Sequence, residues 1–186
     1  SARVLLEQQH AIRVHSALGH GVRHLRRHGA EILADHHAGV TLALERPGAS
    51  GDAGIYSDRV ELQNIKARFP LPDFSGSYKY SQKWGYVRAA GMLRSIKWDD
   101  VLDDQFDLSG DATGWGLNLS SNLNAGKKDV IRLQFVFGEG IQNYMNDAPV
   151  DIGIVNNFSN PVTPILGKPI PITGLVAFLD HTWNEH

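Results

Sequence analysis

A period-two alternation of apolar and polar residues constrains this chain more than any other feature of its sequence. The stretch "GWGLNLSSNLN" (114–124) places a tryptophan and three leucines on one side of an extended chain, with glycine, asparagine and serine on the other. The stretch "VIRLQFVFGEG" (130–140) places four bulky apolar side chains opposite Arg132 and Gln134. Period two is the signature of a β-strand with two unlike faces.

Six segments share the alternation and predict an antiparallel, all-β structure. They span residues 39–45, 74–81, 85–98, 114–124, 130–140 and 174–183. Short connections between them (82–84 and 125–129) alternate with long ones, and all eight prolines lie in the long ones, within 47–73 and 139–173. Up-and-down membrane barrels have this rhythm of short turns and long loops. We therefore expect an up-and-down transmembrane β-barrel.

Length and composition narrow the classes of function. The 186 residues suffice for one ordinary domain, and a net charge of -2 gives no electrostatic reason to expect nucleic-acid binding. The chain has no cysteine, which excludes disulfides, cysteine zinc sites and thiol chemistry. The sequence holds no run of about 18 apolar residues that would predict a membrane helix, whereas a membrane strand needs no such run.

Aromatic residues stand near the ends of the expected strands. They are Trp84, Tyr86, Trp98, Trp115 and Trp183. Tryptophan and tyrosine favour the headgroup layer of a bilayer, which predicts two aromatic girdles at the membrane interfaces. The alternative is that strand-end aromatics cap an ordinary protein core. Trp98 is an even number of residues from Arg88 and Arg94 and therefore lies on the same side of the expected strand. We expect it to point inward, as they do, unless a bulge intervenes.

From about residue 39 to 186, the chain resembles the DcaP-type outer-membrane porins of Gram-negative bacteria. The resemblance rests on "LALERPG" (42–48), "WGYVRAAGMLRSIKWDD" (84–100), "GWGLNLSSNLNAGKKDVIRLQFVFGEGI" (114–141), "YMND" (144–147) and "AFLDHTWNEH" (177–186). The middle block is the most specific, because it joins a "GWGLNLS" strand, a short charged turn and a "FGEGI" strand end in that order.

The resemblance implies a trimeric outer-membrane channel, surrounded by lipid, for passive diffusion of small, often anionic, organic solutes, with no cofactor. Members of the family are about twice as long and close a barrel of about sixteen strands. The chain is therefore expected to be an internal or C-truncated piece, in which residues 38–186 form a partial barrel.

Residues 1–37 differ from the rest and hold seven of the nine histidines. Three interpretations stay open. The segment is a helical or disordered extension, with a helix from about Arg3 to Ala34. Alternatively, histidines four residues apart, such as His20 and His24, hold a metal ion. In the third interpretation the segment is a shifted translation of a barrel segment, and the correct frame resumes near Gly39.

Four cations share the polar sides of the expected strands: Lys79, Arg88, Arg94 and Arg132. If the apolar sides meet lipid, these cations line the lumen and, with no acid on the same faces, attract anions. In the alternative, each arginine pairs with a carboxylate of a loop folded into the pore. The neutral polar lining would come from Asn118, Asn122, Asn124 and Gln134.

No catalytic or metal site is predicted, and we do not expect an enzyme. Asp180 precedes His181, but no serine elbow or nucleophile–base pair accompanies them. The acidic stretch "DDVLDDQFDLSGD" (99–111) lacks EF-hand spacing and is expected to be an exposed loop. Two functions therefore compete: a porin segment, and a soluble β-sandwich or barrel that binds ligands through the long connections at 99–113 and 139–173.

Overall fold

A computed structural model of the chain describes residues 28–35, 37–58, 62–145, 148 and 150–183. Within these ranges the chain is all-β, and every ladder between strands is antiparallel. The strands are β1 (His28–Asp35), β2 (Ala38–Glu45), β3 (Ile65–Arg68), β4 (Asp73–Gln82), β5 (Gly85–Asp100), β6 (Gly110–Ala125), β7 (Asp129–Glu139), β8 (Ile152–Asn156), β9 (Ile165–Pro169) and β10 (Pro171–His181). Two short 3-10 turns are η1 (Gly54–Tyr56) and η3 (Gln142–Tyr144).

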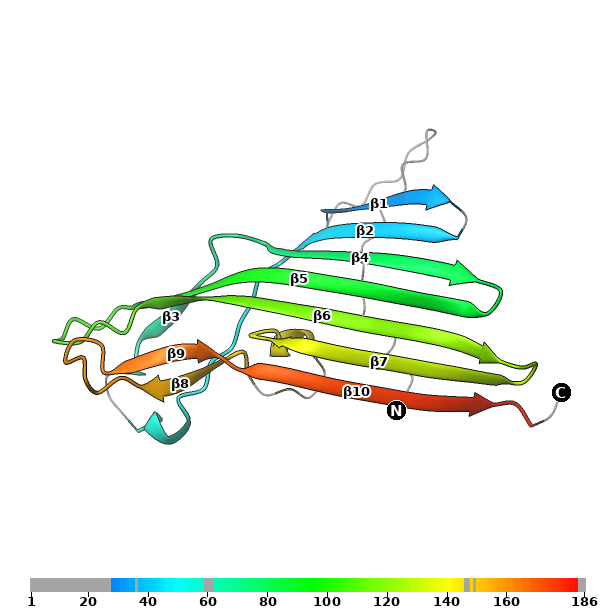
Figure 1. Cartoon of the computed structure of the whole chain (residues 1–186). Coiled ribbons are helices and arrows are strands. Elements are labelled where there is room, and N and C mark those ends of the chain that lie inside the picture. Colours follow the sequence, from blue (N-terminus) through cyan, green and yellow to red (C-terminus); the bar gives the residue numbers. More distant parts are fainter. Residues whose placement is uncertain (1–27, 36, 59–61, 146–147, 149, 184–186) are drawn as a thin grey trace.

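The long strands form one sheet in chain order, as in an up-and-down meander (Figure 1). In the described ranges the order is β1-β2-β4-β5-β6-β7-β10, and β3 pairs with the end of β5 beyond β4. β8 and β9 form a separate hairpin. Strands β1 and β10 lie at the two edges, so the described residues form an open sheet and not a closed barrel.

The sheet has two unlike ends. We call the end with the short connections 83–84 and 126–128 the turn end, and the opposite end, where the long connections gather, the loop end (Figure 1). Gly85 has a φ of 128°, and a Cβ on it would lie 1.9 Å from the carbonyl oxygen of Asn122. Gly126 has a φ of 88°. Glycine alone adopts such backbone angles without strain, which explains why these turns can be so tight.

The six predicted strands are confirmed as β2, β4, β5, β6, β7 and β10. The predicted long connection at 139–173 is wrong in part, because it contains β8, β9 and the start of β10. Pro169 ends β9 and Pro171 begins β10. These are terminal positions, where the missing N–H disturbs the ladder least.

β1 contradicts the last part, residues 28–34, of the helix that was expected from about Arg3 to Ala34. Residues 28–35 are extended and pair with β2, with Leu33 opposite Gly39. The sheet therefore begins before residue 38, where the sequence placed the start of the barrel. The remaining interpretations of the first segment concern residues 1–27, including His20 and His24, and lie outside the described residues.

One face of the sheet is apolar and bare. Cross-strand partners share a face, so the register aligns the apolar sides of all the long strands. Exposed large residues of this face are Leu42, Leu44, Phe74, Tyr78, Tyr80, Val87, Leu93, Leu117, Leu119, Leu133, Phe135, Phe137, Leu175 and Leu179. Leu117 and Leu119, at its centre, are 53% and 52% exposed. The described residues leave this apolar face uncovered.

The polar face is covered instead, toward the loop end. Residues 140–145 and Asp151 lie against it, and Arg94 and Val136 on this face are only 3% and 6% exposed. We call it the loop-covered face. A sheet in water normally buries its apolar side and exposes its polar side, so burial in this sheet is inverted.

A small apolar core lies at the loop end, where the β8–β9 hairpin meets β5. Ile96, Ile152 and Ile165 are 2%, 8% and 3% exposed. Trp98 packs beside them, and its Nε1 donates to the carbonyl oxygen of Leu108 over 2.8 Å. This core holds the long connections together independently of the bare face.

Candidate functional site

Arg94, at the centre of the loop-covered face, joins four segments of the chain. Its side chain is fully buried, with Nε 3.2 Å from Oδ2 of Asp73. Its Nη1 lies 3.1 Å from Oδ1 of Asp151 and also donates to the carbonyl of Gly140. Its Nη2 donates to the carbonyl of Gly48. Asp73 begins β4, whereas the other partners belong to the two longest connections, so Arg94 ties both to the sheet.

Asp151 is the second centre of the same network, and its side chain is also fully buried. Its Oδ1 accepts the backbone N–H of Asn143 over 3.1 Å, and its Oδ2 accepts that of Ser50 over 3.0 Å. The Asn143 side chain in turn donates to Gly48 over 2.9 Å. A buried charge is tolerated only when it is paired and hydrogen-bonded, and these contacts meet that condition.

Tyr144, in η3, closes the network from the loop side. Its hydroxyl donates to Oδ2 of Asp73 over 2.7 Å, and its ring centre lies 5.2 Å from Cζ of Arg94. Burial, and then the hydrogen bond and charge of Asp73, raise the pKa of Tyr144 well above its ordinary value. The tyrosine therefore stays neutral and remains a hydrogen-bond donor.

Glycines let the segment after β7 lie flush against the sheet. A Cβ on Gly116 would lie 2.4 Å from Cδ1 of Ile141, and a Cβ on Gly138 would lie 2.2 Å from the carbonyl oxygen of Trp115. Ile141 is 2% exposed and fills the notch that these glycines leave. Side chains at either position would close the notch and displace the segment.

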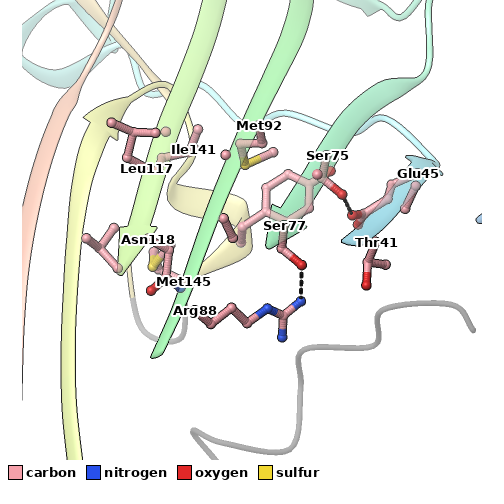
Figure 2. Close-up of a pocket in the computed structure, with 17 residues that line it drawn as sticks. Thr41, Glu45, Ser75, Ser77, Arg88, Met92, Leu117, Asn118, Ile141 and Met145 are labelled. Atoms are coloured by element: carbon pink, nitrogen blue, oxygen red, sulfur yellow. Dashed lines mark hydrogen bonds between the residues drawn. The ribbon is translucent and has the colours of Figure 1, made fainter. Parts of the chain in front are cut away.

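A cavity of about 170 Å³ lies between this segment and the sheet (Figure 2). Its polar lining includes Thr41, Glu45, Ser75, Ser77, Arg88 and Asn118, and its apolar lining includes Met92, Val136, Ile141 and Met145. Figure 2 shows Arg88 donating to Ser77, over 2.9 Å, and Ser75 donating to Glu45, over 2.6 Å. Such a lining suits a molecule with an apolar body and polar groups.

The four predicted lumen cations all lie on the loop-covered face, but their surroundings differ. Arg94 is buried among acids, and Arg132 pairs with Asp180 of the neighbouring strand. Lys79 is exposed, with its Nζ 4.5 Å from the ring centre of Tyr86. Lys79 and Arg88 stand directly opposite each other on β4 and β5.

The expectation of a face without acids is wrong. Glu45 and Asp73 are cross-strand partners on the loop-covered face, and Asp180 shares that face on β10. Asp73 stands just before the alternating segment of β4, and Asp180 lies where the alternation is poor, so the sequence pattern did not reveal them. The alternative interpretation, in which arginines pair with carboxylates of a folded-in loop, describes Arg94, which meets Asp151; Arg132 instead pairs with Asp180 of strand β10.

The four predicted lining amides share the loop-covered face with these cations. Asn118 borders the cavity, and its Oδ1 is buried without a hydrogen bond in the described part of the chain. With its amide oxygen turned toward Arg132, Asn122 accepts from Nη1 over 3.0 Å. Gln134 is half-buried. Asn124 instead donates to the carbonyl of Lys83 over 3.0 Å and so fixes a turn.

Three of the five predicted interface aromatics lie where a girdle would need them. Trp84 and Trp183 are 43% and 81% exposed at the turn end. Trp115 lies on the apolar face toward the loop end, edge-on to Phe137 with ring centres 5.5 Å apart. Its Nε1 donates to Oε1 of Glu139 over 3.1 Å.

Tyr86 and Trp98 point to the loop-covered face, which corrects their assignment to the membrane interface. Tyr86 lies beneath Lys79. The Trp98 ring packs so closely on Gly110 and Gly167 that a Cβ on either would lie 2.6 or 2.5 Å from it. The inward direction that its place on the strand predicts is confirmed, and no bulge turns it around.

The acidic stretch 99–111 uses its carboxylates on its own backbone. Asp100 accepts the N–H groups of Leu102 and Leu108, both over 3.0 Å. Asp107 accepts the N–H of Ser109 over 3.0 Å, and hydrogen bonds from Ser109 lower the pKa of Asp107. These carboxylates stabilise the fold of the loop.

Comparisons with protein-family models, curated proteins and solved structures gave no match for the chain. Among the described residues, no group of three or more histidines and acids is placed to hold a metal ion. No helix in the described ranges is long and apolar enough to cross a membrane.

Proposed function

We propose that the chain is part of a β-barrel channel in the outer membrane, related to the DcaP-type porins, through which small organic solutes diffuse passively. The observation that carries the proposal is the inverted burial of the sheet, with a bare apolar face and a covered polar face. A sheet in water covers its apolar face with a second layer. A membrane barrel turns that face to hydrocarbon and keeps its polar face inside.

The length of the bare apolar band supports the proposal. On β6 the apolar side runs from Trp115 to Leu123, which is about 27 Å along the strand at about 3.4 Å per residue. A strand tilted by about 45° needs about 9–11 residues to cross a bilayer, and this stretch reaches that length. Trp115 lies at one border of this band, and Trp84 and Trp183 lie at the other, where amphipathic rings favour the headgroup layer.

The proposal requires further strands beside β1 and β10. Unpaired N–H and C=O groups along a sheet edge have no partner in hydrocarbon, so only a closed barrel is stable in a membrane. Closure by additional strands of the same protein, and association of the closed barrels into a trimer, belong to the same proposal.

A preference for anions is the part of the proposal that concerns the solute. It rests on Lys79, whose side chain is exposed on the loop-covered face, whereas Arg94 and Arg132 already face carboxylates. An exposed cation raises the local concentration of anions in a lumen. The adjoining cavity gives the solute an apolar contact beside this charge.

A soluble ligand-binding module is the second candidate. A second cavity, of about 320 Å³, supports it, because this cavity lies at the loop end between the β8–β9 hairpin and β5. Ile96, Trp98 and Ile154 are among its lining residues. The bare apolar face argues against a soluble module, since a contiguous patch of this size in water drives aggregation.

Arginine substitutions on opposite faces of β7, made in the complete protein, test the proposed channel. Phe135 is at the centre of the apolar face, and Gln134 points to the other side. We expect Phe135→Arg to lower the folded fraction in lipid vesicles, at a cost of about 2–4 kcal/mol for a cation in the bilayer midplane. Gln134→Arg should fold like the parent chain. Heat-modifiable migration on gels after refolding measures the folded fraction.

A different result would support the soluble module. It would consist of a parent chain that folds in buffer without lipid or detergent, because a second layer of protein would then cover the apolar face. The proposed channel has no explanation for that pattern.

The anion preference is tested by reversal potentials across a planar bilayer with a salt gradient. We expect anion selectivity that falls on Lys79→Gln, because the substitution removes one lumen cation. Lys66→Gln, at the loop end, is the matched control and should leave the potential unchanged. Cation selectivity of the parent channel would contradict this part of the proposal.

A further inference from the structure

Charge is divided unevenly between the two ends of the sheet. The long connections at the loop end and the strand residues beside them carry many acids among the described residues: Asp52, Asp58, Asp99, Asp100, Asp103, Asp104, Asp107, Asp111, Glu139 and Asp151. The turn end instead carries three exposed lysines, Lys83, Lys127 and Lys128. Among the described acids at this end, Asp129 is engaged by His181 and Asp180 by Arg132, and Asp35 lies apart from the lysines, at the end of the edge strand β1. The part of the turn end that carries the three lysines is therefore cationic.

Hydrogen bonds hold the lysine-bearing turns beside one another. Asn124, at the end of β6, donates its backbone N–H to Trp84 over 2.7 Å and its side-chain amide to Lys83 over 3.0 Å. On the other side, the N–H of Thr182 donates to the carbonyl of Lys128 over 3.0 Å. The two turns and the segment after β10 thus form one continuous band at the turn end.

The same band presents two exposed tryptophans. Trp84 packs against Tyr80 with ring centres 6.4 Å apart, and Trp183 packs edge-on against His181 at 4.4 Å. Both rings are supported on one side and exposed on the other. Tryptophan beside lysine at the border of an apolar face is the combination that suits the headgroup level of a bilayer with negative surface charge.

We propose that this band, formed by Lys83, Trp84, Lys127, Lys128 and Trp183, binds the headgroups of anionic phospholipids. The inference rests on the proposed membrane function and adds a lipid partner and a direction. The turn end faces the leaflet that contains anionic phospholipid, and the acidic loop end faces away from it. The lysines supply attraction to the lipid phosphates, and the indole rings anchor the band at the interface.

Refolding of the complete protein, in which further strands close the barrel, into two kinds of vesicle tests the inference. One kind is pure phosphatidylcholine, and the other contains about 30 mol% phosphatidylglycerol, enough to create a negative surface potential. We expect at least tenfold stronger partitioning into the anionic vesicles, because each lysine near such a surface strengthens binding several-fold. The preference should fall as ionic strength rises. Co-sedimentation gives the bound fraction, and heat-modifiable migration gives the folded fraction.

Matched triple substitutions locate the effect. Lys83→Gln, Lys127→Gln and Lys128→Gln together should abolish the preference for anionic vesicles while leaving folding in phosphatidylcholine unchanged. Lys66→Gln, Lys97→Gln and Lys168→Gln together remove the same charge from the loop end and should leave the preference intact. Trp84→Ala with Trp183→Ala should weaken partitioning equally in both kinds of vesicle, because the rings respond to the interface and not to its charge.

Two results would overturn the inference and leave the proposed function standing. The first is equal insertion of the complete protein into both kinds of vesicle. The second is an equal loss of preference in the two lysine triples. Failure of the complete protein to insert into either kind of vesicle would overturn the proposed function, and the inference with it.

Discussion

Arg94 is the residue that holds the long connections against the loop-covered face of the sheet. Its fully buried guanidinium faces Asp73 and Asp151, which are themselves 1% and 0% exposed. Removal of the arginine would leave two carboxylates in a low-dielectric environment without their cation. Deleting one member of a buried ion pair costs far more than the intact pair contributes, because the remaining charge stays desolvated.

We expect Arg94→Met to lower the free energy of unfolding by about 3–5 kcal/mol, the usual cost of an uncompensated buried charge. Urea unfolding in detergent micelles measures it. Arg68→Met is the control, because the Arg68–Asp99 pair is exposed and should contribute at most about 1 kcal/mol. Equal losses in the two variants would show that the buried network does not hold the long connections in place.

Tyr144 makes the packing of the segment after β7 on the sheet sensitive to alkaline pH. Its pKa is raised in the folded chain, so its contribution is complete below the ordinary tyrosine pKa of about 10 and is lost as pH rises further. Above a pH of about 10, we expect the free energy of unfolding of the parent chain to fall, relative to that of Tyr144→Phe, by at most about 1.4 kcal/mol per pH unit. Solvent screening reduces this figure, because the residue is 37% exposed. Urea unfolding of both chains from pH 9 to 12 measures the difference; parallel curves would refute it.

At the scale of elements, the contact between β6, β7 and the segment after β7 depends on missing side chains. The notch for Ile141 exists because Gly116 and Gly138 have no Cβ. A backbone atom limits the space at Gly138, so no side-chain rotation can relieve a clash there. This pairing of strands is therefore intolerant of even one added carbon.

We expect Gly138→Ala to destabilise the fold by about 1–3 kcal/mol, as overpacking of a close contact does, and to expose the segment 140–151 to proteases. Gly91→Ala is the matched control on β5, where a Cβ would meet its nearest atom at an ordinary 3.6 Å. Urea unfolding and limited proteolysis compare the two. A protease-resistant Gly138→Ala chain with parental stability would contradict the notch.

The long strands could be predicted from the sequence, but the elements of the loop end could not. Strands such as β6 and β7 alternate over ten or more residues, because each separates two environments along its whole length. β8 and β9 are five residues each and contain glycine or proline, so no period is established. β1 falls within the stretch for which a helix was one of the open interpretations, and its pairing with β2 depends on the tertiary structure and not on a local pattern.

For the whole molecule, the decisive property is which face of the sheet is covered. The alternation of side chains along the strands correctly predicted which residues share each face, including the inward direction of Arg88, Arg94 and Trp98. This alternation could not place Asp151, which lies 57 residues after Arg94 in sequence and meets it only when the chain folds back. The faces of the site were therefore predictable, whereas its ion pairs, which depend on the path of a long connection, were not.

The bare face predicts how the isolated chain behaves in solution. We expect it to aggregate in buffer and to stay dispersed in micelles of a mild detergent, because detergent covers the exposed leucines and phenylalanines of the sheet. Analytical ultracentrifugation with and without detergent measures this directly. A monodisperse monomer in detergent-free buffer would contradict the proposed membrane function.

The chain-order arrangement of the sheet has a consequence for how the fold is assembled. The hairpins β4–β5 and β6–β7 close over short turns, so their pairing loses little chain entropy. β4 reaches β2, and β10 reaches β7, only across the long connections 46–72 and 140–170. These two pairings therefore cost more chain entropy than the hairpins do. Loop entropy grows only logarithmically, by about 0.6 kcal/mol for each doubling in length, so both long connections can vary in length among related chains without loss of the sheet.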